Sequence, residues 1–189
     1  ERLLRQATGI AKAPYAAEFA EMVVGTGKKL LLFAWHREVW TILEARLKDA
    51  GMVLFTGQES PTQKRASLAA FCDPKGPMGL GMSLRAGSAG LDGLQRVCDT
   101  VAHAELDWAP AIHDQGDGRL YRDGQPNPVV SYRLLSDFGS DPIVADVCGI
   151  KRAQGEPIRN PLAERDEMRQ VDPAHVRTLA ERYLETLKR

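Results

Sequence analysis

Residues 108–125 place a glutamine and two arginines at a spacing that could bind a polyanion. If this segment is helical, Gln115, Arg119 and Arg122 follow one another by four and then three residues, so all three would project from one face. An arginine stays charged, and its planar guanidinium binds phosphate oxygens in pairs. In phosphoryl transfer such an arginine stabilises the charge that develops on the γ-phosphate. The alternative is a solvated basic turn, because the glycines of this segment weaken a helix.

A glycine-rich segment lies upstream, directly after a short apolar run. Residues 83–94 read Ser-Leu-Arg-Ala-Gly-Ser-Ala-Gly-Leu-Asp-Gly-Leu. Glycines let the backbone come close to a phosphate group, and Ser83 adds a hydroxyl at the end of the run. A turn that only reverses the chain would use the same residues. The presence of residues 108–125 downstream favours a phosphate-binding role for this segment over a simple turn.

Together these segments resemble a known family. Residues 115–125, Gln-x-x-Gly-Arg-x-x-Arg-x-Gly-Gln, are similar to motif VI of the Swi/Snf-type DNA-dependent ATPases of helicase superfamily two. Residues 83–94 resemble motif V, and residues 30–35, Leu-Leu-Leu-Phe-Ala-Trp, resemble motif IV. Residues 56–58, Thr-Gly-Gln, resemble the segment between motifs IV and V, and residues 5–14 resemble the lead-in of the annealing-helicase branch. The motifs follow the family's order, and the resemblance covers about residues 1–150.

The chain departs from the family's pattern at four of these positions. Family members usually carry asparagine where Asp92 and Ala109 stand, alanine where Gly116 stands and arginine where Lys64 stands. A carboxylate close to a phosphate would repel it. A role for Asp92 in binding nucleotide is therefore the least certain one to transfer from the family.

The resemblance implies a carboxy-terminal RecA-like lobe, in which arginines reach ATP held by a first lobe. Arg122 would be the arginine finger, Arg119 a second phosphate contact, and Gln115 would position one or both. Gly90 and Asp92 would complete the contribution of this lobe to the nucleotide site. ATP and Mg²⁺ would be bound mainly by the absent first lobe, so we expect the isolated chain to be inactive.

The same resemblance implies that double-stranded DNA lies across the two lobes. Its backbone phosphates would be held on this lobe by residues that follow two strands or begin a helix: Thr56, Gly57, Lys64, Arg65, Ser83 and Arg85. Contacts to phosphates would be independent of base sequence and sensitive to salt. We therefore expect duplex DNA and the first lobe of the same motor as partners, and no membrane.

The order of apolar runs predicts an α/β fold with a parallel sheet covered on both faces. Short apolar runs at 30–35, 52–56, 79–84, 100–106 and 129–135 alternate with helix-like segments at 36–50, 61–72 and 108–114. We expect residues 1–150 to form the RecA-like lobe and 151–189 a helical extension or brace. In the extension, Asp172 could cap a helix over Pro173–Arg189 that packs on the core or faces DNA.

Composition is that of a globular protein with a sizeable core. The 189 residues are 43% hydrophobic and 26% charged, and the net charge is zero, so a DNA site must be a local basic stripe. The three cysteines, an odd number far apart in the chain, suggest neither a disulfide framework nor a metal site. We expect an intracellular protein, in the cytoplasm or nucleoid if it is bacterial or from a phage, and in the nucleus if it is eukaryotic.

Other functions remain open from the sequence. A non-catalytic RecA-like module that docks nucleic acid or protein would also fit, and Asp92 and Ala109 slightly favour it. A self-contained nucleotide enzyme would need a phosphate loop, and the near match at residues 25–28 lacks the first glycine of that motif and precedes a strand, so we expect a turn there. His103, Glu105 and Asp107 alternate along a predicted strand and could share a metal, but we predict none.

Overall fold

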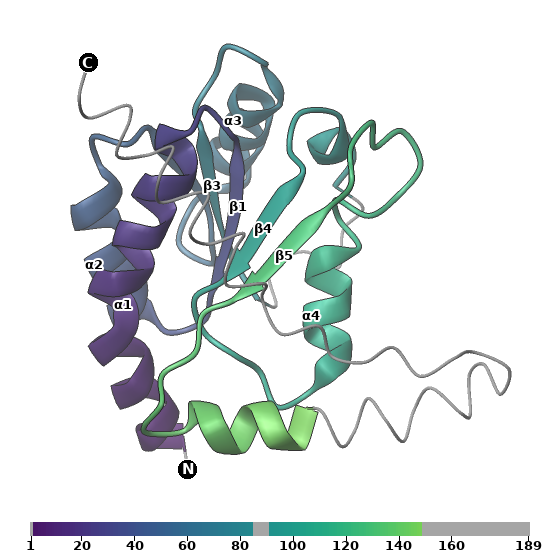
Figure 1. Ribbon diagram of the computed structural model, residues 1–189. Coiled ribbons are helices and arrows are strands. Elements are labelled where there is room, and N and C mark those ends of the chain that lie inside the picture. Colours follow the sequence, from purple (N-terminus) through teal and green to yellow (C-terminus); the bar gives the residue numbers. More distant parts are fainter. Residues whose placement is uncertain (1, 85–90, 149–189) are drawn as a thin grey trace, which may run out of the picture.

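The computed structural model describes residues 2–84 and 91–148, which form a five-stranded parallel sheet with helices on both faces (Figure 1). In chain order the elements are α1 (Arg2–Gly25), β1 (Leu30–Ala34), α2 (Arg37–Leu47), β2 (Met52–Phe55), α3 (Pro61–Cys72), β3 (Gly79–Ser83), the 3₁₀ turn η1 (Leu94–Arg96), β4 (Thr100–His103), α4 (Pro110–Asp117) and β5 (Val130–Arg133). Residues 141–148 are also helical. The predicted α/β fold with a RecA-like parallel sheet is confirmed.

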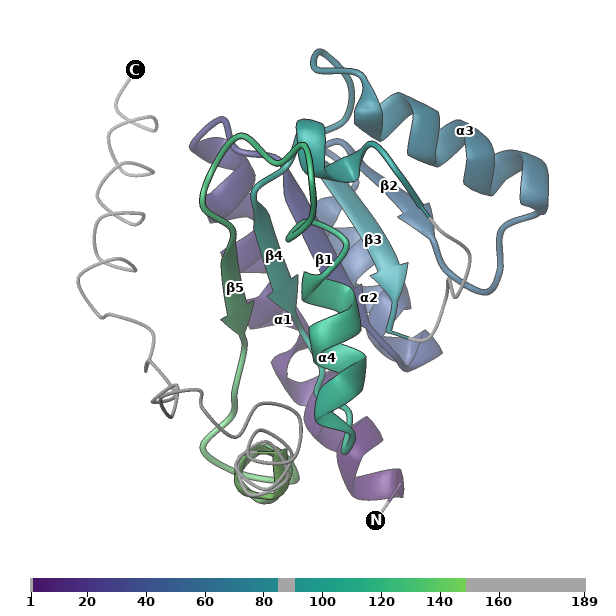
Figure 2. The same cartoon turned by 90° about the vertical axis from the view of Figure 1, so that its right-hand side faces the viewer.

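The central strand β1 divides the core into two layers. All its residues are buried; Leu30 and Leu32 pack against α1 and α2, while Leu31 and Phe33 pack against α3, η1 and the turn after α4. Figures 1 and 2 show α1 and α2 on one face of the sheet and α3 and α4 on the other. Burial on both faces explains why this strand is a continuous apolar run rather than an alternating one.

The strand order, β2-β3-β1-β4-β5, brings all five carboxyl ends to one edge of the sheet. We call this the carboxyl edge. The connection from β1 to β2 runs toward one side of the sheet, whereas the connections from β2 to β3, from β3 to β4 and from β4 to β5 run toward the other side. In open parallel sheets, ligand crevices form at such an edge.

Helix α1 was not predicted. Half of its buried residues are alanines, and it buries none of the large apolar residues that reveal a helix by their periodicity. Pro14 also lies inside it, and a proline removes one helical hydrogen bond. The alanines allow α1 to pack closely along α2 (Figure 1).

The segment after β5 is joined to α1 by a buried polar cluster. Lys12 Nζ donates a hydrogen bond to the Leu134 carbonyl at 2.7 Å and pairs with the Asp141 carboxylate. Burial lowers the pKa of Lys12, although Asp141 opposes this shift. Ser140 N donates to Thr8 Oγ1 at 3.0 Å. Residues 140–148 are therefore attached to the lobe, whereas the predicted extension over 151–189 lies outside the described residues.

Within the described part of the chain, no helix has both the length and the apolar character needed to cross a membrane.

Candidate functional site

The predicted motif VI residues begin in α4 and continue into the turn after it. Pro110 occupies the first turn of the helix, and Asp107 Oδ1 accepts a hydrogen bond from Ala109 N at 3.0 Å, although Ala109 itself cannot cap through a side chain. The helix ends at Asp117, and Gly118 N donates to the Asp114 carbonyl. The prediction that the glutamine and both arginines share one helix face is therefore wrong.

The two arginines nevertheless lie close together. Arg119 is 7% exposed, whereas Arg122 and Gln115 are exposed. Burial and then the neighbouring charge of Arg122 lower the pKa of Arg119. Arg122 is held by two carbonyls, since its Nε donates to Gly118 O at 3.2 Å and its Nη1 to Leu91 O at 3.0 Å. The two positive charges are therefore near enough to repel each other, and an anion bound close to both would relieve this repulsion.

The end of the motif V segment lies against Arg122. Asp92 Oδ1 accepts a hydrogen bond from Gln95 Nε2 at 2.7 Å, and Gln95 Nε2 also reaches the Asp123 carbonyl at 3.3 Å. The hydrogen bond from Gln95 lowers the pKa of Asp92 most, and Arg122 contributes to the same shift. Gln95, which is 2% exposed, was missed by the sequence analysis because it lies outside the motif residues. Gly90 lies outside the described residues.

The arginines lie along the face of the sheet rather than at its carboxyl edge. Asp117 is bonded to His103, the last residue of β4, whereas Gln125 Nε2 donates to the carbonyl of Cys98, just before β4 begins. Residues 117–125, which include Arg119 and Arg122, therefore run back along β4. Helix α4 runs antiparallel to β4, so the segment that carries the arginines returns from the end of β4 toward its beginning.

Most predicted DNA contacts do lie at the carboxyl edge. Phe55 pairs with Met82 in the sheet, so the residues that follow them, Thr56 and Ser83, are neighbours. Gly57 is exposed and Ser83 partly so. Two cationic residues on α3, Lys64 and Arg65, are near this pair: Lys64 Nζ lies 5.5 Å from the centre of the Phe55 ring, and Arg65 is exposed. Arg85 lies outside the described residues.

The amide and the hydroxyl of Thr56 already donate hydrogen bonds to a side chain of the same lobe. Its amide donates to Glu59 Oε2 at 2.5 Å, and its hydroxyl donates to Glu59 Oε1 at 2.9 Å. Thr56 is 4% exposed. A phosphate could therefore reach the Thr56 amide only after Glu59 moves away.

A second glutamate, Glu105, joins the segment after β4 to the segment after β1 at the carboxyl edge. Glu105 Oε2 accepts hydrogen bonds from Trp35 N at 2.7 Å and His36 N at 2.9 Å, and its Oε1 lies 2.6 Å from His36 Nδ1. His36 is the N-cap residue of α2 and makes no side-chain cap of its own, so Glu105 satisfies this helix end. Gly9 of α1 lies against Glu105, since a methyl group there would overlap Oε1.

The three residues considered as a metal site diverge to different partners. His103 Nε2 lies 2.7 Å from Asp117 Oδ1, Glu105 binds His36, and the Asp107 amide donates to His113 Nε2 at 2.9 Å. Asp117 also accepts from two residues of β5, Ser131 at 2.9 Å and Arg133 at 3.2 Å. Among residues 2–84 and 91–148, no group of three or more His, Cys, Asp or Glu has an arrangement that could hold a metal ion.

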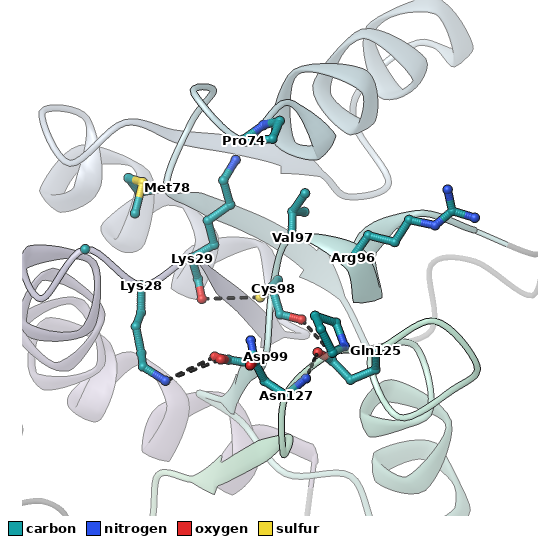
Figure 3. Close-up of a pocket in the computed structure, with 12 residues that line it drawn as sticks. Lys28, Lys29, Pro74, Met78, Arg96, Val97, Cys98, Asp99, Gln125 and Asn127 are labelled. Carbon is teal, nitrogen blue, oxygen red and sulfur yellow. Dashed lines mark hydrogen bonds and ion pairs between the residues drawn. The ribbon is translucent and has the colours of Figure 1, made fainter.

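A cavity of about 380 Å³ lies at the opposite edge of the sheet, between the turn at residues 27–29 and the loop at 125–127 (Figure 3). Its cations do not converge. Lys28 is bonded to Asp99 at 3.3 Å, and Lys29 donates to the carbonyls of Phe71 and Asp73, both at 2.6 Å. Figure 3 shows Arg96 directed away from both lysines. The turn predicted at residues 25–28 is confirmed, and the cavity is not an anion cradle of the phosphate-loop type.

No model of a protein family matches the chain. Its relatives include a protein described as an uncharacterized ATP-dependent helicase of Mycoplasma pneumoniae, 26% identical over 82% of this chain and 15% of the relative. The human lymphoid-specific helicase is 31% identical over 67% of this chain and 15% of that protein. The chain is a relative of the Swi/Snf-type ATP-dependent helicases. The specific likeness to the annealing-helicase branch stays a prediction.

The fold of this Swi/Snf-type chain is also found in a solved structure. The crystal structure of the C-terminal part of the Fun30 ATPase domain superposes with a TM-score of 0.64 at 16% identity, covering 93% of this chain and 53% of that one. The chain thus has the fold of a C-terminal helicase lobe. It spans only about 15% of the length of the two relatives described above.

Proposed function

We propose that the chain is the second motor lobe of an ATP-dependent translocase or helicase that acts on double-stranded DNA. The observation that carries this proposal is the hydrogen bond from Arg122 Nη1 to the Leu91 carbonyl, which joins motif VI to the end of the motif V segment, with the charge of Arg119 nearby. ATP and Mg²⁺ would be bound mainly by a first lobe. An intracellular location, in the nucleoid or the nucleus, belongs to the same proposal, because a motor on duplex DNA works there.

Arg122 is the proposed arginine finger. Its Nε and Nη1 groups donate to backbone carbonyls, which orients the guanidinium, while Nη2 makes no hydrogen bond with the described residues. Arg119 would be a second phosphate contact, and Gln115, on the last turns of α4, would position one or both arginines. Gly90 and Asp92 would border the nucleotide, with Asp92 limiting the net positive charge.

DNA would lie across the carboxyl edge at β2 and β3. Lys64 and Arg65 of α3 supply the charge, and Thr56, Gly57 and Ser83 supply amides and hydroxyls at the strand ends. Arg85 would extend this surface. ATP would close the cleft between the lobes and hydrolysis would reopen it, so that the grip on the backbone moves along the strand.

The decisive experiment joins this chain to an ATP-binding RecA-like lobe and measures DNA-stimulated ATP hydrolysis. We expect the two-lobe protein to hydrolyse ATP and this chain alone to show negligible turnover. Arg122→Ala should lower kcat by about 10³- to 10⁵-fold, because the charge that develops on the γ-phosphate loses its partner. Arg46→Ala is the matched control, since Arg46 is an exposed arginine on α2, on the other face of the sheet. Arg122→Ala activity equal to that of Arg46→Ala would contradict the arginine-finger role.

A second candidate function is a docking module that binds nucleic acid or protein without hydrolysing ATP. Two acidic side chains favour it: Asp92 beside Arg122, and Glu59 on the Thr56 donors. The same two-lobe protein separates the candidates. Duplex binding without DNA-stimulated hydrolysis, and with Arg122→Ala having no effect, would support the docking module.

A further inference from the structure

The amide and the hydroxyl of Thr56 converge on one carboxylate. The amide lies 2.5 Å from Glu59 Oε2, and the hydroxyl lies 2.9 Å from Oε1 and 3.1 Å from Oε2. A negatively charged group with two oxygens is therefore bound by an N–H and an O–H at the end of β2. A backbone phosphate presents the same arrangement of charge and oxygens.

Glu59 differs from the other glutamate that caps a strand end. Glu105 is 3% exposed and is shared by Trp35 and His36, so removing it would leave buried donors without an acceptor. Glu59 is partly exposed, and its hydrogen bonds to the described residues all go to Thr56, three positions earlier in the chain. Its side chain can turn into solvent without disturbing another element.

We propose that Glu59 occupies the position of a DNA backbone phosphate in the free lobe, and that it must leave Thr56 before duplex DNA binds there. This inference rests on the proposed function, because it takes the carboxyl edge to be the DNA surface. The exchange replaces one anion by another on the same donors, so each bound duplex must displace the carboxylate and tolerate its charge nearby. Glu59 thus weakens the grip of this lobe and favours release.

The test measures affinity for a fluorescently labelled duplex by anisotropy at about 50 mM salt. We expect Glu59→Gln, which keeps the size of the side chain but removes its charge, to bind about 3- to 10-fold more tightly than the parent chain. Glu44→Gln is the matched control, because it removes the same charge from an exposed position on α2, on the opposite face of the sheet. In a Thr56→Val background, which lacks the hydroxyl, the gain from Glu59→Gln should shrink.

A second variant, Glu59→Ala, and thermal denaturation distinguish a role of Glu59 in DNA binding from a role in the stability of the turn. If Glu59 only shapes the turn, Glu59→Ala should lower the melting temperature without any gain in affinity, and the proposal would be overturned. Equal affinities of Glu59→Gln and Glu44→Gln would overturn it too, as would the absence of duplex binding by every variant. If Lys64→Ala with Arg65→Ala abolishes binding while Glu59→Gln changes nothing, the DNA surface stands and only the role of Glu59 falls.

Discussion

Several ionisable side chains around the carboxyl edge form hydrogen bonds within the lobe. The effect of such burial on a pKa is clearest for His113. Its Nε2 accepts a hydrogen bond from the Asp107 amide at 2.9 Å, so the ring must be neutral with its proton on Nδ1. It is 3% exposed, and burial, followed by the charge of His103, lowers its pKa to about 3. The buried ring therefore stays neutral well below the ordinary pKa of a histidine.

This shift predicts a loss of stability in mild acid. Between about pH 6.5 and pH 3 the unfolded chain binds a proton at His113 that the folded chain does not, so the free energy of unfolding falls as the pH falls, by at most about 1.4 kcal/mol per unit. His113→Gln retains an acceptor for Asp107 N but does not titrate. Urea denaturation at pH 7.0 and 4.5 should show up to about 2.5 kcal/mol less loss in the variant than in the parent. Equal losses in both proteins would contradict the prediction.

Position 116 shows how one residue can depart from a family pattern for a packing reason. A methyl group on Gly116 would lie 3.1 Å from the His103 ring and 3.2 Å from the Phe33 ring. His103 and Phe33 are stacked at 5.2 Å between centres beneath α4. The glycine thus accommodates a buried histidine on β4, and the departure at this position says nothing against a motor function.

At the scale of elements, the sequence predicted what depends on large apolar residues and missed what depends on packing by small ones. All five strands and α2, α3 and α4 lie where apolar runs and helix-start signals place them; α3 begins at the predicted Pro61 with a Ser60–Gln63 capping box. Helix α1 buries alanines and was missed. The hydrogen bonds of Gln95, Glu59 and Glu105 were also missed. Glu105 binds residues that follow a neighbouring strand, whereas Glu59 and Gln95 bind residues three positions earlier, in turns that no apolar pattern indicates.

The junction of β1 with α2 depends on Glu105 and offers a test of that tertiary contact. Glu105→Gln removes the charge that pairs with His36 and weakens the acceptor for two backbone amides. We expect the free energy of unfolding in urea to fall by about 2–4 kcal/mol, as for other buried charged groups with several donors. Glu44→Gln should change it by less than about 0.5 kcal/mol, as surface substitutions do. A Glu105→Gln protein as stable as the parent would show that this carboxylate does not secure the helix.

Across the whole molecule, two sets of cations serve the proposed function at different places. The arginines after α4 lie along one face of the sheet, whereas Lys64 and Arg65 lie on α3 beside the carboxyl edge. The net charge of the 189-residue chain is zero, so the chain has no general attraction to nucleic acid. Binding must then come from a few local contacts, in keeping with a lobe that grips and releases a backbone in each cycle.

This distribution predicts weak duplex binding with a small but definite salt dependence. With two to four cationic contacts, the logarithm of the association constant should fall against the logarithm of salt concentration with a slope of roughly −2 to −4, since each neutralised phosphate contributes about −0.9. Lys64→Ala with Arg65→Ala should reduce the slope by about two and lower affinity equally for duplexes of different sequence. Lys48→Ala with Arg46→Ala, which removes two exposed cations on and just after α2, should leave the slope unchanged. A slope near zero, or one altered equally by both pairs, would mean that the DNA surface is not at the β2–β3 end of the carboxyl edge.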